Sequence, residues 1–116
     1  MRLRKFHFED ENGREWTLIY TEGFVKYARL QTINIDLVEI GQITEYIAIS
    51  GRQPCWWAIA LALELKDRAK AIAVYRPFAA KFMIIWAKDP ALIGVWITPP
   101  KKIIETIKRL DGIIEH

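Results

Sequence analysis

At 116 residues the chain is long enough for one hydrophobic core, so we expect a single domain over residues 1–116. The hydrophobic share of 52% and the charged share of 27% exclude a disordered chain, and the longest apolar run is too short to cross a bilayer. The formal charge of +3 is mildly basic, which permits a nucleic-acid partner without requiring one.

Three further compositional features bear on where the protein works. No apolar signal-peptide core follows the basic first residues, and the single cysteine allows no internal disulfide. These features predict a cytoplasmic protein with no membrane association. Asn and Gln are scarce while Ile, Glu, Lys and Arg are common, which favours a thermophilic source.

The first two predicted strands form a hairpin. Residues 2–8 and 15–21 alternate in polarity, and Asn12-Gly13 between them suits a tight turn because both residues tolerate positive φ. We expect the hairpin to bury one face, made of Phe6, Phe8, Trp16, Leu18 and Tyr20. Residues 23–42 show no clear period, so a short helix and an extended connection both remain open.

The middle of the chain predicts a β-α-β unit with a strand at 44–49, a helix at 53–68 and a strand at 71–75. Pro54 suits the first helical position because its fixed φ fits there. The helix is apolar almost all round, so we expect both its faces to be covered, one by the sheet and one by a second subunit. Trp57 is expected in the core, and Cys55 is expected to be a small buried hydrophobe.

The last third predicts two more strands, at 82–86 and 92–98, joined by a turn at 87–90. A final helix follows Pro99-Pro100, with one apolar stripe and Gly112 as its C-cap; the stripe consists of Ile103, Ile104, Ile107 and Leu110. The expected fold class is therefore α/β, a Rossmann-like β-α-β core with an N-terminal β-hairpin and a C-terminal helix. Whether this helix covers the sheet or belongs to an interface stays open.

The candidate site is the turn Ser50-Gly51-Arg52-Gln53, between the strand and the helix of the β-α-β unit. The free N–H groups and the positive dipole end of the helix suit a phosphate there. Ser50 is equally consistent with a turn or N-cap role, and Arg52 with a surface pair to a carboxylate. Arg76, directly after strand 71–75, is either a second anion contact or a cap of the sheet edge.

This part of the chain resembles the small CRISPR-associated ring-nuclease family of the Csx type. The resemblance covers about the middle third of the chain and rests on Ile49-Ser-Gly-Arg52, Pro54, Trp56, Leu61-Ala62, Ala73-Val-Tyr75 and Pro77, in this order. That family binds RNA tetranucleotides and cyclic tetra-adenylate in type III systems, and it is a distant relative of the CRISPR-associated Rossmann-fold domains. The resemblance implies a homodimer whose paired turns form one basic groove for such a ligand.

The metal site of that family is not expected here. Family members that cleave RNA hold manganese with a His near the end of the helix, an Asp directly after the Val-Tyr strand and a His after the next strand. The helix tail of this chain offers Glu64, Lys66 and Asp67, and the other two positions are Arg76 and Lys88. Two cations at ligand positions repel a metal ion. We therefore expect no metal, no cofactor and no metal-dependent nuclease activity.

Two functions follow from these observations. The first is a CRISPR-associated protein that binds or sequesters cyclic oligoadenylate or short RNA at the paired turns. Metal-independent cleavage is a variant of it, in which a ribose 2′-hydroxyl attacks the adjacent phosphate and Arg52, Arg76 or Lys88 stabilises the charge. The sequence shows no general base, so whether the protein is an enzyme stays open. The alternative is a non-catalytic structural subunit whose Trp-rich surface dimerises or docks on a larger complex.

Overall fold

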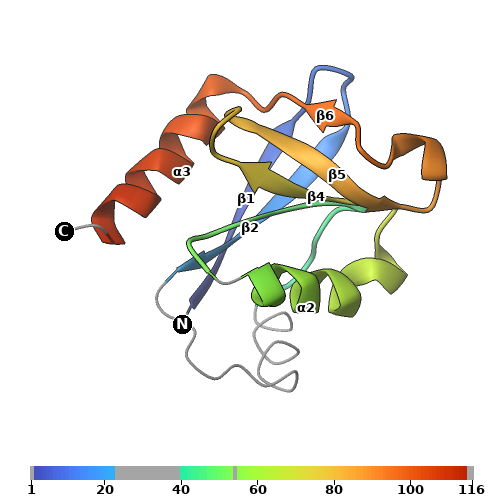
Figure 1. The fold of residues 1–116 in the computed structure, drawn as a ribbon, viewed down its shortest axis with the longest axis horizontal. Helices are drawn as coiled ribbons and strands as arrows, with labels where there is room; N and C mark the ends of the chain where they lie inside the picture. The colour runs from blue at the N-terminus through green and yellow to red at the C-terminus, as the bar shows by residue number, and fades with distance from the viewer. Residues whose placement is uncertain (1, 23–39, 54, 115–116) are drawn as a thin grey trace.

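A six-stranded mixed sheet forms the centre of the computed structural model, which describes residues 2–22, 40–53 and 55–114 (Figure 1). Its strands are β1 (Arg2–Glu9), β2 (Glu15–Glu22), β3 (Tyr46–Ser50), β4 (Ala71–Arg76), β5 (Lys81–Ala87) and β6 (Trp96–Ile97). They lie in the sheet in the order of the chain. The pairings β2–β3 and β3–β4 are parallel, and the other three are antiparallel. The predicted α/β class and the parallel β-α-β unit are confirmed.

The N-terminal hairpin forms where the sequence predicts it, although Asn12 does not take the positive φ that the Asn12-Gly13 pair suggested. Gly13 adopts a φ of +79° in the turn, and β1 pairs with β2 in register from Arg2–Glu22 to Glu9–Glu15. The buried carboxylate of Asp10 holds the turn, because it accepts hydrogen bonds from the backbone N–H of Asn12 (2.8 Å) and from the indole of Trp16 (2.8 Å). The hairpin is thereby fixed at its tip as well as along its ladder.

Two helices cover opposite faces of the sheet, α2 (Cys55–Leu65) on one and α3 (Lys101–Ile114) on the other (Figure 1). The core under α3 contains the predicted hairpin face together with Ile103, Ile107 and Leu110. The core under α2 contains Ile19, Ile47, Ile49 and Ile72 of the sheet with Trp57, Leu61 and Leu65 of the helix. The C-terminal helix therefore covers the sheet, which answers the question that its sequence left open.

Because both faces are covered, the polar side of β2 is also buried. Thr17 and Thr21 are fully buried, and each has a hydrogen-bond partner. The Thr17 hydroxyl lies 2.8 Å from the hydroxyl of Thr44 and accepts from the backbone N–H of Thr44. Because both hydroxyl groups have hydrogen-bond partners, their burial does not leave an unsatisfied polar atom in the core.

Three predicted boundaries in the second half of the chain are wrong. The helix at 53–68 ends as an α-helix at Leu65 and continues only as the 3-10 helix η1 (Lys66–Arg68). The strand at 92–98 is reduced to β6, because Asp89 caps the 3-10 helix η2 (Pro90–Leu92) and Gly94 turns the chain at a φ of +87°. Gly112 lies within α3 rather than beyond it, since helical hydrogen bonding continues to Ile114.

Two predictions fall outside the described residues, namely the conformation of 23–39 and the place of Pro54 at the start of the helix. Within residues 2–22, 40–53 and 55–114, no helix has the length and apolar character that a bilayer crossing needs.

Candidate functional site

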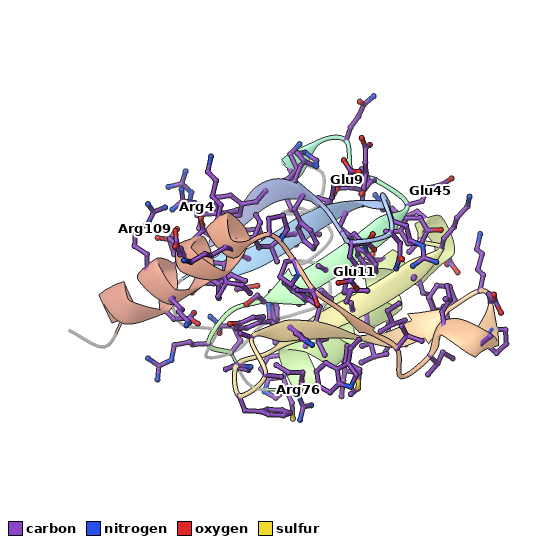
Figure 2. The ribbon with its side chains drawn as sticks, turned by 90° about the horizontal axis from the view of Figure 1, so that it is seen from above. Arg4, Glu9, Glu11, Glu45, Arg76 and Arg109 are labelled. Carbon is purple, nitrogen blue, oxygen red and sulfur yellow. The ribbon has the colours of Figure 1, made fainter. Side chains whose placement is uncertain are left out.

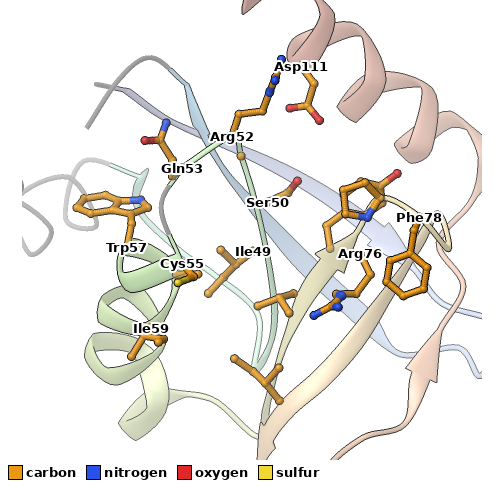
Figure 3. A pocket seen from close by; sticks show the side chains of 16 residues that line it. Ile49, Ser50, Arg52, Gln53, Cys55, Trp57, Ile59, Arg76, Phe78 and Asp111 are labelled. Carbon is orange, nitrogen blue, oxygen red and sulfur yellow. The ribbon is translucent and has the colours of Figure 1, made fainter. Parts of the chain in front are cut away.

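A cavity of about 760 Å³ lies over the carboxyl ends of β3 and β4, between α2 and the turn that joins β4 to β5 (Figure 3). All five residues predicted for the site line it: Ser50, Gly51, Arg52, Gln53 and Arg76. Its apolar lining comes from Ile49, Val74 and Ile85 of the sheet and from Ala58 and Ile59 of α2. In open α/β sheets, ligands bind outside the carboxyl ends of parallel strands, so the cavity occupies the position expected of a binding site.

Gly51 shapes the turn that forms one wall of the cavity. Its φ is +138°, a backbone conformation that side-chain-bearing residues rarely adopt. A Cβ atom at this position would lie 2.7 Å from the backbone oxygen of Thr21, at the end of β2. The glycine is therefore required both by its own conformation and by the close approach of the neighbouring strand. Ser50 precedes it at the end of β3, and only 9% of its surface is exposed.

Trp57 holds the first turn of α2 against the same end of β2. The side chain is buried, as predicted, and its indole N–H donates to the Thr21 hydroxyl at 2.9 Å. Thr21 thus contacts the chain on both sides of residues 52–53, through its backbone at Gly51 and through its hydroxyl at Trp57. The wall that carries Arg52 and Gln53 is consequently fixed at both of its ends.

Asp111 of α3 enters the cavity from the other face of the sheet. Its carboxylate accepts a short hydrogen bond from the hydroxyl of Tyr20, which lies on β2. Asp111 is not among the site residues predicted from the sequence, although it continues the i, i+4 spacing of the buried Ile103 and Ile107. A carboxylate in line with an apolar stripe is the signal by which Asp111 could have been found.

Asp111 and Arg52 both act on the pKa of Tyr20, with opposite signs. Burial raises the pKa of Tyr20 above its usual value, and the hydrogen bond and negative charge of Asp111 raise it further, while the positive charge of Arg52 opposes the shift. The phenol therefore stays protonated and remains the donor at neutral pH. In Figure 3 the Arg52 side chain extends toward Asp111 at the rim of the cavity. The guanidinium and the carboxylate thus belong to one site.

Arg76 marks the opposite rim. It is the last residue of β4, one residue beyond the predicted strand at 71–75, and its guanidinium lies over the ring of Phe78, 5.3 Å from the ring centroid. Both residues line the cavity and both are exposed. The geometry agrees with an anion contact, because a ring against the face of the guanidinium leaves the N–H groups at its edges to meet an anion. In Figure 2 Arg76 lies apart from the labelled acidic residues Glu9 and Glu45.

The position of Cys55 contradicts the prediction. The side chain is exposed, because Cys55 is the first residue of α2 and faces the cavity rather than the core. The neighbouring Trp57 occupies the buried position instead. A small apolar residue within an apolar run is buried only when its helical position faces the sheet, and the run itself does not specify that position.

The positions that correspond to the manganese ligands of the resembled family do not fit a metal ion. Arg76 ends β4, whereas Lys88 follows β5 at the other end of this strand pair, where its backbone N–H bonds to the carbonyl of Lys70. Asp67 lies in η1, beyond the carboxyl end of α2. Among the described residues, no three His, Cys, Asp or Glu side chains come together. Lys88 is also not among the residues that line the cavity, so it cannot act there as a third cation.

A scan against models of protein families matches none of them, and a search of curated proteins finds no significant match.

Proposed function

We propose that the cavity binds the sugar-phosphate backbone of a short RNA or a cyclic oligoadenylate. One observation carries the proposal. The two turns that the sequence singled out for anion binding, at residues 50–53 and at Arg76, line one cavity, and each contributes an arginine to it. Two arginines suit phosphates because each offers a planar set of donors to the anion.

The size and lining of the cavity favour a nucleotide over a single inorganic anion. A volume of about 760 Å³ is in the range of pockets that hold small organic ligands. The apolar side chains of Ile49, Val74, Ile59 and Ile85 offer a surface for a base, while Arg52 and Arg76 lie at the rim. Bases bind proteins largely by stacking and apolar contact, and phosphates by arginine, so both parts of the ligand have a complementary surface.

The proposal includes membership of the CRISPR-associated Csx-type ring-nuclease family. It also includes the distant relationship of that family to the CRISPR-associated Rossmann-fold domains. A doubly wound Rossmann sheet reverses its strand order at a switch point, whereas this sheet keeps the order of the chain. The shared feature is the β3–α2–β4 unit, with its turn at the carboxyl end of β3. In this role the protein binds or sequesters the ligand of a type III system.

A homodimer belongs to the same proposal. The face of α2 turned away from the sheet exposes large apolar side chains, with Trp56 at 43%, Ile59 at 56% and Leu63 at 59% of their surface. Ile59 also lines the cavity, so a second subunit seated on this face would extend the binding surface. The apolar character of the whole helix, which the core alone does not explain, is then accounted for.

The direct test is a calorimetric titration of the protein with cyclic tetra-adenylate and with linear tetra-adenylate RNA. We expect both Arg52→Ala and Arg76→Ala to weaken binding by roughly tenfold or more, because each removes a charge-assisted hydrogen bond. Arg68→Ala is the matched control, since Arg68 is exposed in η1, beyond the other end of α2. Equal effects of all three substitutions would argue for non-specific attraction to a basic protein.

Cleavage is tested separately, by chromatography of cyclic tetra-adenylate after long incubation with the protein and EDTA. In the metal-independent reaction the ribose 2′-oxygen bonds to phosphorus and the bond to the 5′-oxygen breaks. The proton passes from the 2′-hydroxyl to that oxygen, giving a 2′,3′-cyclic phosphate and a 5′-hydroxyl. Recovery of intact ligand would assign the protein to binding alone.

The second candidate is a non-catalytic structural subunit, and the exposed apolar face of α2 favours it. It predicts that Arg52→Ala leaves assembly and function intact, whereas Trp56→Ser abolishes assembly in analytical ultracentrifugation. Absence of binding to both nucleotide ligands, together with this result, would replace the first proposal by the second.

A further inference from the structure

The cavity contains a carboxylate that phosphate binding alone does not explain. Asp111 lines it together with Arg52 and Arg76, and a negative charge at this place repels a phosphate. A site built only for an inorganic anion would be weakened by this residue. The presence of Asp111 therefore points to a ligand that carries a hydrogen-bond donor in addition to its negative charge.

The carboxylate is held in place from β2. The Tyr20 side chain is fully buried, and its hydroxyl donates to Asp111 across 91 residues of sequence. A carboxylate has about four lone-pair positions, so one bond from tyrosine leaves capacity for a further donor. An acceptor fixed in orientation can select a ligand hydroxyl, because little side-chain freedom is lost on binding.

We propose that Asp111 determines sugar specificity: its carboxylate accepts a hydrogen bond from a ribose 2′-hydroxyl, so that the cavity prefers RNA to DNA of the same sequence. This inference rests on the proposed function. In a ribonucleotide the 2′-hydroxyl and the 3′-phosphate are attached to neighbouring carbons. A site for both needs an acceptor beside a cation, and Figure 3 shows Asp111 and Arg52 in that relation. The 2′-hydroxyl is also the group by which proteins distinguish RNA from DNA.

The test compares three fluorescein-labelled tetra-adenylates by fluorescence anisotropy: the RNA, the DNA and the 2′-O-methyl RNA. For the unmodified protein we expect the RNA to bind roughly tenfold more tightly than the DNA, as for one hydrogen bond to a charged acceptor. The 2′-O-methyl RNA keeps the 2′-oxygen but lacks its hydrogen. It is therefore expected to bind as weakly as the DNA, which separates donation from sugar pucker.

Asp111→Asn is the informative variant, because the amide oxygen can still accept from Tyr20. We expect the preference for RNA over DNA to fall to about twofold or less, since a neutral amide is a weaker acceptor than a carboxylate. Binding of the DNA is expected to stay the same or to tighten, because a charge that repels its phosphates is gone. Asp111→Ala serves as the second variant, and thermal unfolding reports whether each variant is folded.

Glu105→Gln is the matched control. Glu105 is an exposed acidic residue of the same helix and does not line the cavity. Glu105→Gln therefore changes the net charge by the same amount as Asp111→Asn, but it is expected to leave the preference for RNA over DNA unchanged. Equal loss of RNA and DNA binding in Asp111→Asn would assign the residue a structural role and overturn the inference. Equal binding of RNA and DNA by the unmodified protein, with both arginines still required, would overturn it and leave the proposed function standing. Binding of none of the three ligands would overturn both.

Discussion

Replacing Gly51 by alanine tests whether the turn that lines the cavity is held rigidly. The φ of +138° is nearly restricted to glycine, and such strain costs about 1–3 kcal/mol. The new Cβ would also lie 2.7 Å from the backbone oxygen of Thr21, and overpacking of this kind costs a further 1–3 kcal/mol or so. Because β2 lies between β1 and β3 in the sheet, the strand cannot move away from the turn without disturbing two ladders.

Together these terms predict that Gly51→Ala lowers the free energy of unfolding by about 2–6 kcal/mol. For a domain of this size, 1 kcal/mol corresponds to about 3–6 °C in Tm, so we expect Tm to fall by about 6 °C or more. Urea titration gives the free energy of unfolding, and calorimetry gives Tm. Binding of tetra-adenylate RNA at a temperature where the variant is folded then shows whether the distorted turn still holds the ligand.

Gly94→Ala is the control for the backbone contribution. Gly94 also has a positive φ, of +87°, but a Cβ there would meet no atom within 4 Å. We expect a cost of about 1–2 kcal/mol, from the backbone conformation alone. A cost for Gly51→Ala no larger than that for Gly94→Ala would refute the reasoning, because it would mean that the contact with Thr21 is easily relieved.

Four further outcomes are expected. Gly112→Ala raises the free energy of unfolding by up to about 1 kcal/mol in urea titration, because Gly112 lies inside α3 with open space around it. Asp10→Ala lowers the same quantity by about 2–3 kcal/mol, since the hairpin turn loses its buried acceptor. The raised pKa of Tyr20 means that the unfolded chain releases this proton first, so stability falls as the pH rises above about 10, and less so in Tyr20→Phe. Cys55 reacts readily with a maleimide in the folded protein, as mass spectrometry will show, and bound tetra-adenylate slows the reaction.

Local signals in the sequence were sufficient for several elements. The hairpin followed from two alternating segments and a turn in which Gly13 takes the positive φ that was expected. The β-α-β unit followed from the spacing of two β-branched runs around an apolar helix. Because chain connectivity forces the turn at 50–53 to the carboxyl end of its strand, its place at the cavity was also predictable. Each of these features is decided by residues within a few positions of one another.

The errors arose where a neighbouring element decides the outcome. The apolar run that contains Cys55 and Trp57 predicts a helix, but only the packing of that helix on the sheet decides which side chain is buried. The expected strand at 92–98 is an error of a different kind, because the Asp89 side chain and Gly94 favour a tight turn through local contacts. Apolar content alone does not exclude such a turn.

The sequence by itself determined the α/β class, the parallel β3–α2–β4 unit and the residues of the turn that lines the cavity, because these depend on periodicity, turn chemistry and connectivity. Only the tertiary structure decided that α3 covers the sheet and brings Asp111 to the cavity beside Arg52. Tyr20 and Asp111 are 91 residues apart, and no local pattern specifies a contact of that range. The physical reason is that the apolar stripe of α3 specifies burial, whereas the face and direction of packing are set by the whole sheet.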